Sequence, residues 1–60
     1  MTSKEIIEAL KAKGYHLTII EIDLGIPWHR LDRCMKGAIE FKESEYKAIR
    51  DYAISKGVEL

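Results

Sequence analysis

Residues 17–37, LTIIEIDLGIPWHRLDRCMKG, decide the fold of this chain. Two short apolar patterns lie in this stretch, and both have the period of an α-helix. Ile20 and Leu24 stand four residues apart on one helical face, and Leu31 and Cys34 stand three apart on another. The stretch therefore predicts two short helices whose apolar faces meet in a shared core.

The residues between these two patterns predict a tight corner. Gly25 can take a positive φ at no steric cost and end the first helix. Pro27 has a preset φ and no N–H to lose, so it suits the first turn of the second helix, expected over residues 27–36. Ile26 would point inward and lock the corner. A helix, a glycine turn and a helix with apolar inner faces are typical of a helix-turn-helix.

A second interpretation exists for residues 15–22, YHLTIIEI, because β-branched and aromatic residues favour a strand. A lone strand would need a partner, and only the short tail at residues 57–60 offers one. The glycine corner downstream also suits two helices better than a hairpin. We therefore expect a helix that begins at His16 or Thr18, where Thr18 and Glu21 have capping-box spacing.

Helical patterns flank this stretch on both sides. Thr2-Ser3-Lys4-Glu5 has capping-box spacing, with Ser3 an equally good cap, and Lys13-Gly14 closes the first helix. A last helix begins at Lys42 or Glu43 and ends at Lys56. Its buried stripe is Tyr46, Ile49 and Ala53. The expected fold is all-α, a compact bundle of four to five short helices containing a helix-turn-helix.

Length and composition limit the function classes. Sixty residues allow one domain, residues 1–60, with a small core. A single cysteine excludes an internal disulfide and suits a reducing cytoplasm, and no leader, long apolar run or lipidation motif is visible. We therefore expect a soluble cytoplasmic protein with no membrane partner. No phosphate-binding loop, metal-ligand spacing or activated nucleophile is visible, so we expect no enzyme activity, cofactor, metal or small-molecule substrate.

The charges are unevenly spread along the chain. The formal net charge is zero, which argues against a generic polycation that coats nucleic acid. Residues 1–27 and 43–60 each carry three bases against four acids, whereas residues 28–42 carry four bases against two acids. The basic excess therefore lies on the second predicted helix of the corner and just after it.

A basic helix of this kind fits the major groove of DNA. Arg30 and Arg33 can each donate two hydrogen bonds to a guanine. Asp32 can accept from a cytosine amino group or hold a neighbouring arginine, and His29 can donate or accept. Phosphate contacts are expected from Thr18, Lys36 and Lys42.

The corner as a whole resembles the helix-turn-helix of lambda-type repressors and Cro proteins, the XRE-type family. Counting from Leu17, the turn glycine is at position nine, and apolar residues are at positions four, eight, ten, fifteen and eighteen. Gly37 then follows the second helix. The preceding EIIEALKAKGYHL, residues 5–17, is similar to the lead-in of Ner-like phage repressors. The resemblance covers residues 5–57.

This resemblance implies a sequence-specific regulator of transcription that binds double-stranded operator DNA. The family's base-contacting positions correspond here to Pro27, Trp28, His29, Asp32 and Arg33. Pro27 has no side chain able to hydrogen-bond, and Trp28 either contacts DNA or covers a corner of the core. Glu21 departs from the pattern, because alanine is usual where the two helices touch. A glutamate there needs a solvent edge or a basic partner; without either, the helix-turn-helix interpretation is wrong.

Two further expectations concern protein partners. The apolar surface of the last helix continues beyond its stripe, which predicts a weak two-fold homodimer unless the last residues are a frayed tail. The expected dimer residues are Tyr52, Ile54, Val58 and Leu60. The alternative function is a small protein-binding module, an antirepressor or inhibitor, because neutral charge and exposed Trp28, Tyr52 and Ile54 also suit that class.

Overall fold

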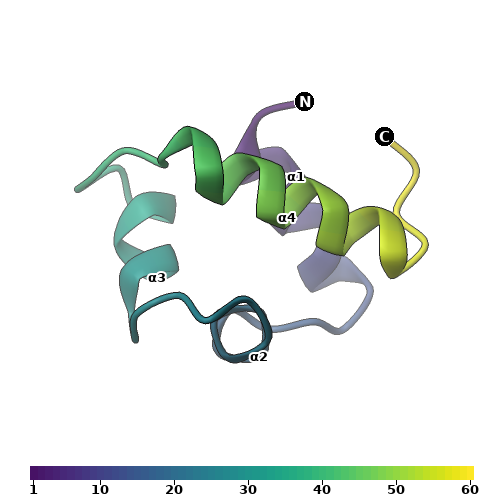
Figure 1. The fold of residues 1–60 in the computed structure, drawn as a ribbon, viewed down its shortest axis with the longest axis horizontal. Coiled ribbons are helices and arrows are strands. Elements are labelled where there is room, and N and C mark those ends of the chain that lie inside the picture. The colour runs from purple at the N-terminus through teal and green to yellow at the C-terminus, as the bar shows by residue number, and fades with distance from the viewer.

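Four α-helices and no strand make up the computed structural model of the chain, which describes residues 1–60. The helices are α1 (Ser3–Ala12), α2 (Leu17–Leu24), α3 (Arg30–Met35) and α4 (Glu43–Ser55). α4 packs along α1, and α2 and α3 close the other side of the core (Figure 1). The all-α prediction is confirmed, and none of the four helices has the length and apolar character needed to cross a membrane.

The first helix begins with a complete capping box. The Thr2 hydroxyl accepts a hydrogen bond from the Glu5 N–H at 3.2 Å, and the Glu5 carboxylate accepts one from the Thr2 N–H at 2.9 Å. Thr2 is therefore the cap, and Ser3 is the first helical residue. The hydrogen bond from the Thr2 N–H is also the main reason why the pKa of Glu5 is lowered.

All four helices contribute to one core. Ile6, Ile7 and Leu10 of α1 are completely buried against Ile20 of α2 and Leu31 of α3. From α4, the predicted stripe residues Ile49 and Ala53 are completely buried, and Tyr46 packs against them at the edge. Cys34 lies on the inward side of α3, and burial raises the pKa of its thiol.

The corner after α2 has the predicted glycine geometry. Gly25 has φ 68°, in the left-handed region, and its N–H donates to the Ile22 carbonyl. The Ile26 N–H donates to the Glu21 carbonyl at 2.9 Å. These two bonds form a Schellman motif, which satisfies carbonyls left unpaired at the end of a helix.

The beginning of the next helix differs from the prediction. Pro27 is not in its first turn, because α3 begins only at Arg30. Residues 27–29 form a turn in which the Arg30 N–H donates to the Pro27 carbonyl at 3.1 Å. His29 takes φ 64°, so the helical backbone cannot continue backwards through it.

The C-terminal residues fold back onto the core. Val58 donates its N–H to the Ala53 carbonyl at 2.9 Å, and its side chain is buried. Tyr52 is also buried, and its hydroxyl donates to the Asp23 carboxylate of α2 at 2.7 Å. The placement of Tyr52 and Val58 on an exposed dimer surface was therefore wrong, because one copy of the chain already covers both.

Replacing Gly25 by valine should destabilise the protein by about 1–3 kcal/mol, because a β-branched residue is strained at a positive φ. No atom lies within 4 Å of the position that a Cβ would take, so the cost arises in the backbone alone. Gly25→Asn is the matched control, since asparagine tolerates the left-handed region. Equal melting temperatures for the two variants would contradict this account.

Burial, followed by the bond to Asp23, raises the pKa of Tyr52 to about 12 from an ordinary value of 10.0. The stabilisation linked to this phenol is therefore complete below pH 10 and is lost as the pH rises through about 12. In an absorbance titration, the ionisation of Tyr52 should be centred near pH 12. Asp23→Asn should lower the pKa of Tyr52 but leave it above 10, because burial remains. A titration curve unchanged by Asp23→Asn would rule out the proposed role of this bond.

Candidate nucleic-acid interface

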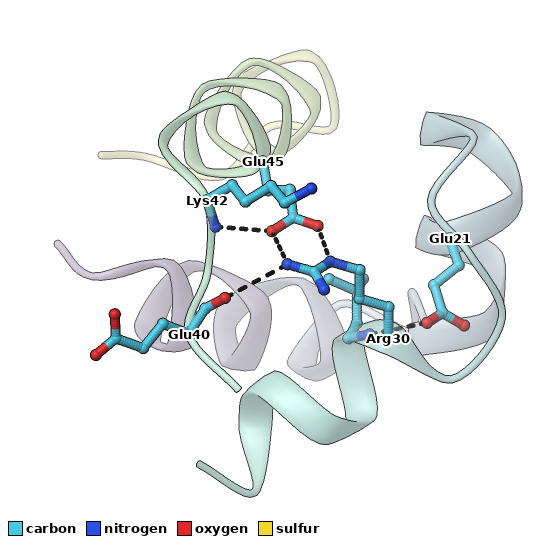
Figure 2. A network of polar contacts seen from close by, with 6 residues as sticks. Glu21, Arg30, Glu40, Lys42 and Glu45 are labelled. Carbon is cyan, nitrogen blue, oxygen red and sulfur yellow. Dashed lines mark hydrogen bonds and ion pairs between the residues drawn. The ribbon is translucent and has the colours of Figure 1, made fainter. Parts of the chain in front are cut away.

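A carboxylate from α2 holds the beginning of α3. Glu21 is only 4% exposed, and it accepts the Leu31 N–H at 2.9 Å and the His29 N–H at 3.3 Å. Figure 2 shows its carboxylate directed at the beginning of α3. A helix begins with unpaired N–H groups and a partial positive charge, and Glu21 complements both. Glu21 therefore has neither the solvent edge nor the basic side chain that the sequence predicted, and it does not cap α2 with Thr18; two main-chain N–H groups are its partners instead. His16 is the N-cap of α2, and no side chain caps that helix.

The turn before α3 presents an exposed tryptophan. His29 is the only non-glycine residue with a positive φ, and its N–H is held by Glu21. The Trp28 ring lies edge-on to the His29 ring, with 5.3 Å between the centroids. Trp28 is 61% exposed, so it does not cover the core. This turn therefore offers a large aromatic surface directly beside the first residue of α3.

Arg30 does not lie free on the outer surface, as the sequence suggested. Its Nε and Nη2 atoms donate to the two carboxylate oxygens of Glu45 on α4, the latter at 3.0 Å (Figure 2). Nη2 also donates to the Glu40 carbonyl at 3.4 Å. The side chains of Arg30 and Glu45 are only 20% and 11% exposed. The guanidinium thus joins α3, α4 and the connector between them.

The carboxylate of Glu45 has a second task at the beginning of α4. It accepts the main-chain N–H of Lys42, the N-cap residue, at 2.7 Å. The hydrogen bond from Arg30 is the main cause that lowers the pKa of Glu45, and the same bond raises the pKa of Arg30. Both groups are therefore charged at neutral pH.

The remaining polar residues of α3 face solvent. Lys36 and Asp32 form an exposed i,i+4 ion pair at 3.0 Å, a contact of low strength in water. Arg33 is exposed and makes no ion pair within the chain. Solvent also reaches the other predicted contact residues, which are Thr18, Pro27, Trp28, His29 and Lys42. Of the nine predicted DNA-contact residues, Arg30 alone belongs to an ion pair that is mostly shielded from solvent.

The outward side of α2 exposes two isoleucines beside Thr18 and Asp23, a feature that the sequence did not lead us to predict. Ile19 and Ile22 are 41% and 66% exposed and lie three residues apart on this helix. No lysine or arginine occurs in residues 14–29. The available signal was that α2 has more isoleucine and leucine residues than one inward face can bury, whereas a helix at a protein surface normally has one polar face. Outside α2 and the turn that follows it, the exposed large apolar side chains are Met1, Ile54 and Leu60.

Comparisons with known proteins do not assign a family. No protein-family model matches the chain, and no curated protein or solved structure is significantly similar to it. The function is therefore argued from the geometry and charge of α2, α3 and the turn that joins them.

Glu21→Ala should lower the free energy of unfolding by about 1–3 kcal/mol, because the buried Leu31 N–H would lose its acceptor. Glu8→Ala is the matched control, since Glu8 is exposed on α1 and takes part in no ion pair. Urea denaturation measures both variants. Equal midpoints would mean that Glu21 does not stabilise the beginning of α3.

Proposed function

We propose that this protein is a sequence-specific regulator of transcription of the Cro or phage-repressor type. In this proposal α2 and α3 form a helix-turn-helix, and α3 enters the major groove of an operator. The carrying observation is the corner itself. A Schellman turn at Gly25 joins two core-packed helices, and the second helix points an unpaired arginine, Arg33, to solvent. Occupancy of the operator would block or recruit polymerase.

The exposed polar residues of this surface would contact DNA in different ways. Arg33 has no competing partner in the chain, so its guanidinium is available to donate two hydrogen bonds to a guanine. Lys36 is bound only to exposed Asp32, a contact that a phosphate can replace at little cost. Thr18 and Lys42 are exposed at the first turns of α2 and α4 and would contact phosphates.

The N-terminus of α3, which could otherwise bind a phosphate, already binds the carboxylate of Glu21. Main-chain N–H groups at a helix N-terminus bind anions, and here the Glu21 carboxylate fills that position. Phosphate contacts in the proposed complex would therefore come from side chains. The exposed Trp28 would supply an apolar contact next to α3.

One copy of so small a domain would cover a limited length of DNA, so we propose two copies on a two-fold symmetric site. Because Tyr52 and Val58 belong to the core, the proposed weak homodimer would use only Ile54 and Leu60 of the predicted dimer residues. Each contributes a half-exposed side chain, consistent with an association that DNA completes.

A protein-binding module is the second candidate, and the outward side of α2 favours it. Ile19, Ile22 and Trp28 are large, apolar and exposed, and this part of the chain has no lysine or arginine to attract phosphates. Such a surface would suit an antirepressor or inhibitor that binds another protein. The salt dependence of binding to bulk DNA separates the two candidates, because phosphate neutralisation releases counterions and gives a steep slope.

Arg33→Ala should cost about 1–3 kcal/mol of operator affinity and relax the preference at one base pair. Lys36→Ala should instead weaken binding evenly across sequences and reduce the salt slope by about one. Footprinting on the DNA that flanks the coding region supplies the operator, and binding isotherms at several salt concentrations supply both quantities.

Equal and sequence-independent losses in both variants would contradict direct base contact by Arg33. Absence of any salt-dependent binding by the unaltered protein would contradict the DNA-binding function as a whole. That second result would leave the protein-binding module as the better account of the exposed α2 surface.

A further inference from the structure

Arg30 is a cation on the proposed recognition helix that the chain itself keeps away from DNA. Its guanidinium makes two hydrogen bonds to Glu45 and a third to the Glu40 carbonyl. By contrast, Arg33 and Lys36 on the same segment are exposed. Of the three cations on this segment, Glu45 holds Arg30, whereas Arg33 and Lys36 remain accessible to DNA.

The geometry of the pair also fixes how α3 lies against α4. A planar guanidinium that binds both oxygens of a carboxylate restricts direction as well as distance. Glu45 is itself held by the Lys42 N–H at 2.7 Å, so the carboxylate cannot rotate freely. Figure 2 shows Glu45 and Glu21 approaching the first turn of α3 from different directions. The beginning of α3 is thus held both by α4 and by α2.

We infer that Glu45 is a positioning residue that sets how strongly α3 discriminates between DNA sequences. This inference rests on the proposed function. An arginine that is not directed at a base edge can bind a phosphate instead, and phosphate contacts carry no sequence information. By holding Arg30, Glu45 removes one non-specific contact. By fixing α3 on α4, it directs Arg33 at a defined position in the groove.

The test compares Glu45→Gln with Glu43→Gln. Both changes remove one negative charge from the first turn of α4, but Glu43 is exposed and contacts only Lys47, at 3.8 Å. In Glu45→Gln the released Arg30 adds one phosphate contact, so the salt slope on non-operator DNA should steepen by about 0.9. Between 50 and 200 mM salt this is an extra affinity loss of about three-fold. The ratio of operator to non-operator affinity should fall, whereas Glu43→Gln should change neither quantity.

A double variant guards against a folding defect, because Glu45→Gln leaves Arg30 half-buried without its partner. Arg30→Gln with Glu45→Gln removes both charges and retains similar side-chain sizes. It should show the salt slope of the unaltered protein, because no cation is released. Its operator discrimination should still be reduced several-fold, because α3 is no longer held on α4. A purely structural role for the pair would lower the melting temperature and leave slope and discrimination unchanged.

The outcomes separate the inference from the function on which it rests. If the unaltered protein binds no DNA in a salt-dependent way, the proposed function fails and the inference fails with it. If the unaltered protein discriminates its operator, but Glu45→Gln matches Glu43→Gln in slope and ratio, the inference alone is overturned. A double variant with undiminished discrimination would overturn it as well.

Discussion

The two hydrogen bonds that Glu21 accepts at the beginning of α3 are the contacts on which the α2–α3 half of the molecule depends. α3 has only six residues, and a helix of this length is not stable in water without tertiary support. Glu21 satisfies the main-chain N–H groups of its first turn, and Leu31 and Cys34 then secure its inner side in the core. The left-handed conformation of His29 persists in the same way, because its N–H is held by this carboxylate.

Placing two carboxylates against one short helix has a cost, because removing a charge from water is unfavourable unless it is well paired. Both acids meet this condition. Glu21 receives two N–H donors, and Glu45 receives the guanidinium of Arg30 and the N–H of Lys42. Charged groups arranged in this way restrict the orientation of a helix more closely than apolar contacts do, since hydrogen bonds are directional. A defined orientation of α3 is also what a protein that distinguishes base sequences needs.

The two proposed binding surfaces lie next to each other and differ in chemistry. The exposed side of α3 is polar and cationic, whereas the outward side of α2 exposes two isoleucines and has no cation. Because Arg30 is paired, the basic excess of residues 28–42 is smaller on the surface than in the sequence. A surface with few free cations favours selective contacts over general attraction to nucleic acid, in agreement with the zero net charge.

Local patterns in the sequence were sufficient to predict the four helices, a cap at Thr2 or Ser3, the left-handed Gly25 and most of the core, because each depends on residues within about one helical turn. The tertiary structure alone decided that α3 begins at Arg30, that Arg30 pairs with Glu45, and that Tyr52 and Val58 are buried. Glu21 and Leu31 are ten residues apart, Arg30 and Glu45 fifteen, and Asp23 and Tyr52 twenty-nine. Helical periodicity contains no information about such pairs, because they meet only when separate helices pack against a common core.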